Sequence, residues 1–495
     1  MAKGALWMIL ARLTERGLGF ISTIILVRLL APADFGLVAM ATSVIAICEL
    51  FGQVGLDVAL IQNPGATRRH YDTAWTFGVM LSALTAVVLL IMAVPAAEFY
   101  GEPRLLAILL SLALGSFISG FENIGVVAFR KELRFNKEFQ FFFGRKLVGF
   151  LITVPLAFIL RNYWALIAGI IVGRLAGVCL SYYVQEYRPR WSLEARHDLF
   201  HFSKWMVASN VVTVVNVRAA DFILGKITGA HALGVFNVSY ELSNLPTSEL
   251  IAPINRAVFP GYARKSADPT VLQQGYLGVI GIIAAFGIPA GVGIAATANI
   301  LVPLIFGPQW VEAIPLVAIL AIYGILAAMK TNAHYVYLVL GRPNTASYLG
   351  LAQISLLLPS LTILSMRYGV LGAAYAYLAS QAVFTPFSFW TLLETLGISV
   401  HQLLRVLWRP VVSSAFLLVI VRLIITPLPL EPIDNLTRLI HLMTVVVSGI
   451  VSYVSCLYVL WMISARPVGA ESQFLGAVQS TRLWWRFKDA LALSR

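Results

Sequence analysis

The sequence predicts an all-α, polytopic membrane protein of about fourteen transmembrane helices, arranged as two six-helix lobes and two additional C-terminal helices. Hydrophobic residues make up 59% of the chain and charged residues only 12%, and its mean hydropathy is +0.83. A soluble domain carries about 25% charged residues, so this chain could not cover itself with a solvated surface. Runs of about 20 mostly apolar residues, the length that crosses a bilayer, recur along the chain.

Fourteen apolar runs follow one another along the chain. Those of the first half cover residues 7–30, 36–61, 72–95, 104–129, 139–160 and 163–186. Those of the second half cover residues 204–227, 232–259, 274–303, 312–340, 345–366, 370–393, 406–427 and 437–463. The first, fifth, seventh and tenth runs contain charges, so twelve or thirteen spans are alternatives. The N-terminal "MAKGALWMILARLTERG" places charges where a cleavable signal needs an apolar core, so no signal is predicted.

Lysine and arginine are unevenly distributed between the two sides, and this asymmetry predicts the orientation. With the N-terminus inside, the inner connections and the tail are basic through Arg68, Arg69, Arg130, Lys131, Arg134, Lys137, Arg188, Arg190, Arg196, Arg264, Lys265, Arg466, Arg482, Arg486, Lys488 and Arg495. The outer connections hold little beyond Arg104, Arg161 and Arg367. We therefore expect both termini in the cytoplasm. The formal charge of +13 reflects this asymmetry rather than nucleic-acid binding.

Few residues form a motif of known chemistry. Cys48, Cys179 and Cys456 fall inside apolar runs without a CxxC pair, so we interpret them as buried hydrophobic residues without disulfides. His197 and His201 are spaced i, i+4, but no HExxH glutamate accompanies them, and an amphipathic lateral helix is the better interpretation. The sequence contains no Walker motif, dinucleotide-binding fingerprint or nucleophile constellation. It therefore predicts no enzyme, no cofactor and no metal site.

One short pattern occurs twice, 198 positions apart. Residues 28–43 are "RLLAPADFGLVAMATS" and residues 226–241 are "KITGAHALGVFNVSYE". In each copy a glycine, Gly36 or Gly234, follows a bulky apolar residue, and a basic residue lies eight positions before it. Both copies lie where the outer end of one predicted span turns into the next, and spans 1 and 7 both start on the inner side. A parallel repeat of this kind, related by an axis along the membrane normal, occurs in one class of transporters.

The repeat defines the predicted organisation. We expect an N-lobe of spans 1–6 (residues 1–187), a cytoplasmic linker (188–203) and a C-lobe of spans 7–12 (204–395). Two additional spans (396–465) and a basic amphipathic cytoplasmic tail (466–495) follow. Substrate would be handled between two lobes that rock against each other, which is an alternating-access mechanism.

Polar and charged residues interrupt the apolar runs of several spans. A charge at the membrane centre costs roughly 2.5–3.5 kcal/mol on insertion scales, so these residues predict a water-filled cavity. The polar residues expected to line it, with a possible role in ion coupling, are Glu15, Glu49, Gln53, Asp57, Asn210, Asp221, Asn237, Glu241, Asn244, Lys330 and His334. The alternative is structural: local pairs of Arg12 with Glu15 and of Arg218 with Asp221, and snorkelling of Arg16 near the cytoplasmic end.

An ordered set of segments resembles a known transporter family. The segments are "LARLTERGLGFISTIILVRLLAPADFGLVAMA", "FGQVGLDVALIQ", "LFHFSKWMVASN" and "LGVFNVSYELSNLPTSELIAPINRAVFPGYAR". Together they are similar to the polysaccharide-exporter branch of the multidrug/oligosaccharidyl-lipid/polysaccharide superfamily, in particular to Wzx-type flippases of the WzxC-like group. The resemblance covers roughly residues 5–395.

This resemblance implies a flippase of the bacterial inner membrane. It would move an undecaprenyl-diphosphate-linked oligosaccharide to the outer leaflet for exopolysaccharide, capsule or lipopolysaccharide biosynthesis. The implied partners are this lipid-linked oligosaccharide, membrane lipids, and the polymerase and chain-length regulator of the same pathway, with no nucleic acid. Guanidinium groups bind phosphate oxygens in pairs, and the candidate diphosphate contacts are Arg12 and Arg16 first, then Arg145, Lys146, Arg174 and Arg218.

Two other functions remain open at this point. A cation-coupled multidrug antiporter of the same superfamily could bind a cation through Glu49, Asp57 and Glu241. Against it, the polar stripe of span 1 has two arginines to one glutamate, and this positive charge would repel a cation. A membrane polymerase or glycosyltransferase of the same pathway would need a sizeable catalytic loop outside the membrane, whereas the predicted outer loops are short. Both arguments favour the flippase.

Reporter fusions can test the predicted orientation, because cytoplasmic and periplasmic reporters are active on opposite sides of the membrane. Fusions after Arg69, Lys137 and Arg196 should report the cytoplasm. Fusions after Tyr100, Asn162 and Pro429 should report the periplasm. The measurement is the activity of green fluorescent protein and alkaline phosphatase at each position. Inverted signals at any two of them would contradict the two-lobe arrangement, which depends on where span 7 begins.

Overall fold

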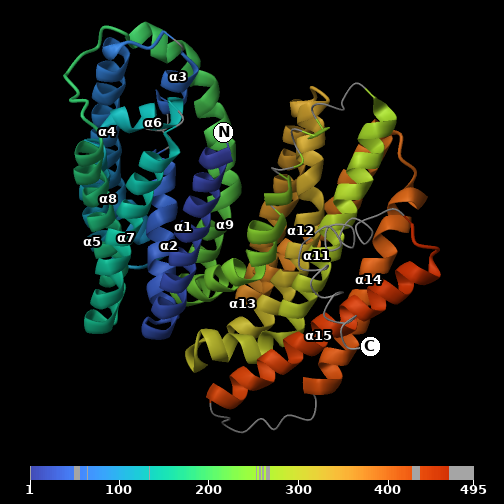
Figure 1. The fold of residues 1–495 in the computed structure, drawn as a ribbon. Helices are drawn as coiled ribbons and strands as arrows, with labels where there is room; N and C mark the ends of the chain where they lie inside the picture. Colours follow the sequence, from blue (N-terminus) through green and yellow to red (C-terminus); the bar gives the residue numbers. More distant parts are fainter. Residues whose placement is uncertain are drawn as a thin grey trace, which may run out of the picture. The chain divides into compact units, whose positions relative to one another are not determined.

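The computed structural model shows a chain of long helices (Figure 1). It describes residues 2–49, 56–63, 65–132, 134–251, 253–255, 258, 261–262, 268–425 and 435–467, and no strand occurs within these ranges. The helices of the first half are α1 Ala2–Leu29, α2 Pro32–Glu49, α3 Leu56–Gln62, α4 Arg68–Tyr100, α5 Arg104–Ser119, η1 Ile124–Val126, α6 Val127–Lys131, α7 Phe135–Leu160 and α8 Trp164–Val184. Those that follow are α9 Arg196–Leu245, η2 Pro246–Ile251, α11 Pro269–Ile305, η3 Pro308–Trp310, α12 Ala313–Val339, α13 Pro343–Leu396, α14 Val400–Ile425 and α15 Asn435–Ile463.

The prediction of fourteen spans is confirmed in the described part of the chain. α9 and α13 each consist of two helices joined at a glycine with a left-handed backbone, Gly229 (φ 77°) and Gly369 (φ 58°). Such a backbone costs an ordinary L-residue roughly 1–2 kcal/mol, so glycine allows each turn without a longer loop. With α9 and α13 each counted as two, and with α5 and α6 as one bent span, the long helices among the described residues number fourteen.

The fourth predicted span, residues 104–129, is not one straight helix. α5 ends at Ser119, and the chain bends by 65° into η1 and α6. Asn123 holds the bend: its side chain accepts a hydrogen bond from the backbone N–H of Gly125 (2.9 Å) and donates one to the backbone carbonyl of Tyr187 (2.6 Å). Hydropathy predicted a single span because the apolar run continues through the bend.

The chain forms two units, unit 1 with Met1–Asn237 and Ile305–Gln309, and unit 2 with Val238–Leu304 and Trp310–Arg495. In unit 1, successive neighbours are α1, α7, α8, α5 and α4, and α2 packs on α4 and α5. Membrane helices approach closely through small residues. A Cβ on Gly169 of α8, for example, would lie 1.7 Å from Oγ1 of Thr153 on α7. The lobe boundaries suggested by the repeat remain predictions.

Unit 2 is organised around α11. One buried cluster joins α11 to α12, α13 and α14 through Tyr276, Val336, Leu392 and Leu403. A second cluster joins α11 to α14 and α15 through Ala296, Leu417 and Tyr453. The hydroxyl of Tyr453 also donates a hydrogen bond to the backbone carbonyl of Ala285 on α11 (2.8 Å). The two additional C-terminal helices therefore pack on α11 within this unit.

The non-helical residues 185–195, which overlap the predicted linker, are held along α4. Asp72 of α4 accepts hydrogen bonds from the hydroxyl of Tyr187 and from the backbone N–H of Arg190, the latter at 2.8 Å. Burial and the hydrogen bond to Asp72 raise the pKa of Tyr187, so its phenol is a neutral donor. Two further bonds run from the N–H groups of Ser192 and Ala195 to the hydroxyls of Thr76 and Thr73. The chain is thus fixed to unit 1 as far as the start of α9.

The duplicated pattern marks the place where the start of α2 crosses residues 230–234 of α9, all of which belong to unit 1. A Cβ on Gly36 would lie 1.7 Å from the backbone oxygen of Ala230, and a Cβ on Gly234 would lie 1.8 Å from that of Pro32. Pro32 and Ala230 are 198 positions apart, as are the two glycines. The contact of Gly36 with Ala230 and the contact of Gly234 with Pro32 are therefore equivalent: each joins the glycine of one copy of the pattern to the corresponding residue of the other copy. We call this contact of residues 32–36 with residues 230–234 the glycine crossing.

Asp34 fixes the start of α2 at the glycine crossing. One carboxylate oxygen accepts a hydrogen bond from the backbone N–H of Ala31 (3.0 Å), and the other accepts one from the N–H of Tyr163 (3.0 Å) in the connection between α7 and α8. A carboxylate in the first turn also interacts favourably with the helix dipole. One side chain thus orients α2 and ties it to the α7–α8 connection.

Replacing Gly36 with Ala should lower the thermal stability of the protein. The new methyl group would meet backbone atoms, which cannot rotate away, and overpacking typically costs about 1–3 kcal/mol. Gly234→Ala should have a similar effect. The double variant should lose less than the sum, because either methyl group forces the same two backbones apart. The measurement is the Tm of each variant purified in detergent.

Gly293→Ala is the matched control for the crossing glycines. Gly293 is a helical residue of α11 whose added Cβ would meet nothing within 4 Å. Alanine there should leave the Tm unchanged or raise it slightly, because alanine favours helix over glycine. Additive losses at Gly36 and Gly234 would show that the two residues do not share one contact.

Candidate functional site

A cavity of about 620 Å³ lies inside unit 1 between α1, α2, α7 and α8. Its volume falls in the range of small-molecule sites, about 300–1,000 Å³. Its described lining includes three basic side chains, Arg145, Lys146 and Arg174, and no acidic one, so we call it the cationic cavity. Four glycines leave room in its walls, Gly19, Gly149, Gly169 and Gly173. The cavity thus presents three basic side chains between apolar helices.

Arg174 lies at the middle of α8, ten residues from either end, or about 15 Å along the helix. Its guanidinium donates hydrogen bonds to Oε1 of Glu49 at the end of α2 (3.0 Å) and to Oγ of Ser116 on α5 (2.5 Å). Only 15% of the Arg174 side chain is exposed, against 35% of Glu49. A charge at this depth needs such partners. Arg174 therefore joins three helices around one compensated charge.

The other two cations of the cavity come from α7. Arg145 lies ten residues after the start of α7, about 15 Å along the helix, and its Nη1 donates a hydrogen bond to Oε2 of Glu122 in the α5–η1 bend (3.1 Å). The amine of Lys146 lies against α1 at Gly19, where a Cβ would be only 3.2 Å from Nζ. A carboxylate thus holds one α7 cation, and the absent side chain of Gly19 makes room for the other.

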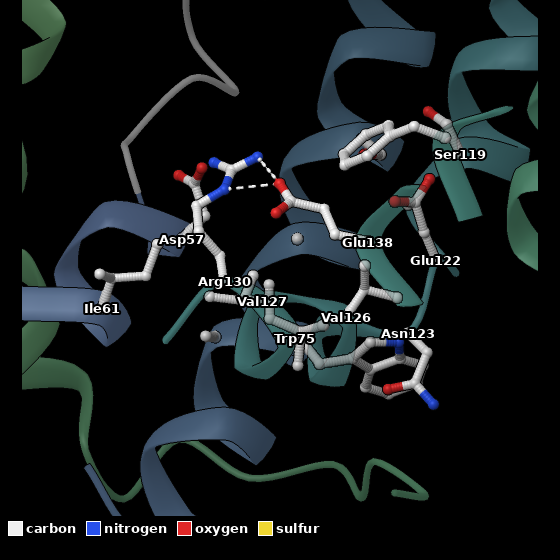
Figure 2. A pocket seen from close by; sticks show the side chains of 16 residues that line it. Asp57, Ile61, Trp75, Ser119, Glu122, Asn123, Val126, Val127, Arg130 and Glu138 are labelled. Carbon is white, nitrogen blue, oxygen red and sulfur yellow. Dashed lines mark hydrogen bonds and ion pairs between the residues drawn. The ribbon is translucent and has the colours of Figure 1, made fainter. Parts of the chain in front are cut away.

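A second cavity of about 330 Å³ has an acidic lining, and we call it the acidic pocket. Its charged residues are Asp57 of α3, Glu122, Glu138 of α7 and Arg130 of α6 (Figure 2). Arg130 pairs with Glu138, with 2.8 Å between Nη2 and Oε1 (dashed in Figure 2). Glu122 lines this pocket, whereas its partner Arg145 lines the cationic cavity. The Glu122–Arg145 ion pair therefore connects the two cavities.

A local network occupies the residues of α9 before and after its glycine turn. Nη1 of Arg218 lies 3.2 Å from Oδ2 of Asp221, whose side chain is 8% exposed. The side chain of Asn237 also hydrogen-bonds Asp221. The i, i+3 pair expected under the structural alternative is thus present, while the part of these three residues in substrate handling stays a prediction.

The candidate residues of unit 2 have different surroundings. Asn244 donates a hydrogen bond to the backbone carbonyl of Tyr240 in its own helix (2.9 Å). Glu241 and His334 are exposed. The amine of Lys330 donates to the side chain of Gln353. The role of these residues stays a prediction.

The predicted site residues differ in where they lie. The structure brings Arg145, Lys146 and Arg174 together in one cavity and pairs Glu49 with Arg174, while Asp57 lies in the acidic pocket. Arg16 is exposed on α1. The side chains of Arg12, Glu15 and Asn210, and the whole of Gln53, lie outside the described residues, so their roles stay predictions.

Sequence inspection missed three residues: Glu122 and Glu138 line the acidic pocket, and Ser116 accepts a hydrogen bond from Arg174 of the cationic cavity. For Glu122 a signal existed, because it is the only Asp or Glu among residues 103–131, most of which form an apolar run. Glu138 belongs to a stretch of mixed charges before span 5 and gave no comparable signal. Ser116 gave none either, because small polar residues are common in membrane helices.

Comparisons of sequence relate the chain to proteins of polysaccharide biosynthesis. A family model described as "Polysaccharide biosynthesis protein" matches residues 25–315, more than half of the chain. The lipopolysaccharide biosynthesis protein WzxC of Escherichia coli is 24% identical over 426 residues, which cover 84% of this chain and 86% of WzxC. The succinoglycan biosynthesis transport protein ExoT of Rhizobium meliloti is 24% identical over 338 residues, which cover 66% of this chain and 67% of ExoT.

Comparisons of structure relate the fold to membrane transporters. The lipid II flippase MurJ in its inward closed conformation aligns with a TM-score of 0.74 at 11% identity, covering 93% of this chain and 100% of MurJ. An inward-facing multidrug resistance MATE family transporter of the MOP superfamily aligns with a TM-score of 0.60 at 16% identity, covering 77% of this chain and 95% of the transporter. The all-helical fold is therefore shared with these transporters.

Replacing Arg174 with Met should lower the yield of folded protein, because Glu49 would be left as a carboxylate without its cation inside the membrane. Breaking a buried ion pair costs about 3–5 kcal/mol, and the 35% exposure of Glu49 makes this an upper limit. Adding Glu49→Gln to the same chain should restore the yield, because it removes the uncompensated charge. The measurement is the monodisperse peak in fluorescence-detected size-exclusion chromatography.

Arg104→Met is the control for this pair. It removes the ion pair between Arg104 and Glu102, whose N···O distance of 2.7 Å is similar to that of the Arg174–Glu49 pair. The Arg104 side chain, however, is 50% exposed. Exposed pairs contribute about 0–1 kcal/mol, so the yield should change little. Equal yields of Arg174→Met and the double variant would contradict the pairing of Arg174 with Glu49.

Proposed function

Because the chain belongs to the polysaccharide biosynthesis protein family, we propose that it is the flippase for an undecaprenyl-diphosphate-linked oligosaccharide. It moves this repeat unit from the inner to the outer leaflet, for synthesis of exopolysaccharide, capsule or lipopolysaccharide. The chain is a multi-pass membrane transporter and not an enzyme. The names of its relatives, a lipopolysaccharide biosynthesis protein and a succinoglycan biosynthesis transport protein, support a cargo that is a glycan intermediate.

The cationic cavity is the observation that carries this proposal. A diphosphate concentrates negative charge on oxygens that a planar guanidinium binds two at a time. Arg145, Lys146 and Arg174 supply three cations in one cavity. The two arginines are held by Glu122 and Glu49, so an incoming diphosphate exchanges one oxyanion partner for another. The lipid tail can stay in the bilayer while the headgroup enters the cavity.

The same observations weaken the two alternatives. A cation-coupled multidrug antiporter would need an acidic side chain to bind a positively charged drug, whereas the described charged residues that line the cationic cavity are all basic. A polymerase or glycosyltransferase needs catalytic groups outside the membrane, but the connections at residues 101–103 and 161–163 are only three residues long. An oxyanion carried on a lipid fits the described residues better than either alternative.

The remaining features of the proposal concern orientation, partners and mechanism. We place both termini on the cytoplasmic side of a bacterial inner membrane, which the basic inner connections support. Partners besides the substrate and the lipids are the polymerase and chain-length regulator of the pathway. The mechanism is alternating access between the N-lobe and the C-lobe, and the sequence repeat supports it. Arg12 and Arg16 of α1 are proposed as further diphosphate contacts.

Deletion of the gene tests the proposed function. Full-length lipid-linked oligosaccharide should accumulate on the cytoplasmic face, with little polymer outside, and the wild-type gene should restore export. Leaflet-specific labelling of the oligosaccharide and measurement of extracellular polymer give both readouts. Accumulation of truncated oligosaccharides would indicate an assembly enzyme instead.

A second arm of the same experiment tests the cationic cavity. The double variant Arg174→Met/Glu49→Gln is expected to fold but lacks the guanidinium, so its polymer output should fall roughly tenfold or more, the loss of one charge-assisted contact. Glu49→Gln alone keeps Arg174 but breaks the ion pair, so its output at matched membrane expression separates loss of the guanidinium from loss of the pairing. Wild-type output from the double variant at matched membrane expression would make Arg174 a structural residue only.

A further inference from the structure

Lys330 of α12 is a charged group of unit 2 that the proposed function leaves unused. It lies nine residues before the end of α12 at Val339, about 14 Å along the helix. Its side chain is only partly exposed. An ammonium at this depth is unfavourable unless its surroundings compensate it. The nature of that compensation therefore indicates what the residue does.

No acidic side chain compensates Lys330 within the described part of the chain. The sequence contains no Asp or Glu between Glu312 and Glu394, so α12 has none and α13 has none before Glu394. The partners of the amine are the side-chain oxygen of Gln353 and the ring of Phe384, whose centroid lies 5.6 Å from Nζ. Both partners stabilise a cation without cancelling its charge.

A chain of three side chains is oriented by this charge. An ammonium can only donate hydrogen bonds, so Gln353 presents its carbonyl oxygen to Lys330. The amide nitrogen of Gln353 then donates to Oε1 of Gln381 (2.6 Å), and the amide nitrogen of Gln381 donates to Oγ1 of Thr385 (3.2 Å). All these dipoles point their negative ends toward Lys330, and aligned hydrogen bonds strengthen one another. We call these three residues the amide relay.

The amide relay differs from the compensation of the cations in unit 1. Arg145 and Arg174 of the cationic cavity are each neutralised by a glutamate. Lys330 keeps its net charge, and an ammonium has three N–H donors of which Gln353 takes one. A cation without a counter-charge whose N–H groups can still donate hydrogen bonds is the arrangement that binds an anionic ligand.

The same face of α12 carries groups that suit a sugar. Tyr323 lies seven residues before Lys330, two helical turns away on the same face. Its ring packs with those of Tyr377 and Tyr240, with centroids 5.3 Å and 6.0 Å away. Tyrosine combines an apolar ring with a polar hydroxyl, as a sugar combines apolar ring faces with hydroxyls. Lys330 therefore lies on the same face of α12 as an aromatic group that suits a sugar.

We propose that Lys330 binds an oxyanion of the lipid-linked substrate and that the amide relay holds it charged for this purpose. The identity of the ligand rests on the proposed function. The shared chemistry is an oxygen anion that accepts charge-assisted hydrogen bonds, and it has two possible sources. One is the diphosphate of the lipid carrier, and the other is the carboxylate of an acidic sugar in the oligosaccharide.

Gln353→Glu is the decisive variant. It has the shape of glutamine but places a carboxylate beside Lys330, which supplies the missing counter-charge. If Lys330 had only a structural role, this ion pair would leave the protein as stable as before or more so and would leave ligand binding unchanged. If Lys330 binds an anion, the carboxylate competes with the ligand while the protein still folds. Lys330→Met is the companion variant that removes the charge.

Binding is measured on the full chain in phosphatidylcholine nanodiscs, with undecaprenyl diphosphate and sodium glucuronate as separate probes and glucose as the neutral match. Both variants should weaken binding of at least one oxyanion about tenfold. A loss confined to undecaprenyl diphosphate assigns the carrier headgroup, and a loss confined to glucuronate assigns the acidic sugar. Lys226→Met is the matched control, because it also removes a lysine over a phenylalanine ring (Phe99, 5.2 Å) but at an exposed position of α9.

The outcomes separate this proposal from the proposed function. Wild-type binding of both probes by folded Gln353→Glu protein would overturn the role of Lys330 and leave the flippase function standing. Failure of the wild-type protein to bind either probe would overturn the role of Lys330 as well. The flippase function is judged independently, by the leaflet in which lipid-linked oligosaccharide accumulates in the deletion strain.

Discussion

At the glycine crossing, Gly36 lies against the backbone of Ala230, and Gly234 lies against the backbone of Pro32. Lipid is as apolar as most side chains, so burial of apolar surface does little to hold membrane helices together, and close backbone packing has a larger part. Weak Cα–H···O contacts become possible at such an approach. The crossing fixes the first turn of α2, which Asp34 also ties to the α7–α8 connection. Because α2 is a helix, its far end is fixed as well, and there Glu49 meets Arg174.

Charge inside the membrane-spanning helices is stabilised in two ways. In unit 1, Arg145 and Arg174 are paired with glutamates on other parts of the chain, so each cation is neutral together with its partner. In unit 2, Lys330 is stabilised by amides and an aromatic ring and keeps its charge. A paired arginine can exchange one oxyanion for another without leaving an uncompensated charge in a low-dielectric region. This exchange is consistent with a ligand that must be bound and then released.

The fold does not by itself decide what is transported. A lipid II flippase and a multidrug transporter share this architecture, as unrelated functions often share a fold. We propose that the charged side chains lining the cavity are the discriminating feature. The cationic cavity presents three cations, while the described carboxylates of unit 1 nearest to it either pair with those cations or line the separate acidic pocket. We propose that side-chain charge on a common scaffold carries the substrate preference.

The sequence alone determined the membrane class, the fourteen spans and the repeat, because a bilayer imposes a length and an apolar composition that a single segment must satisfy by itself. It also singled out Arg145, Lys146, Arg174 and Glu49, because a charge inside an apolar run is visible without knowledge of any partner. Only the tertiary structure decided the pairings. Glu122 and Arg145 are 23 positions apart, and Glu49 and Arg174 are 125 apart. Helical periodicity gives the face on which a residue lies but not the helix that faces it. That choice depended on the glycine crossing and on the bend at Asn123, where the packing of several segments acts together.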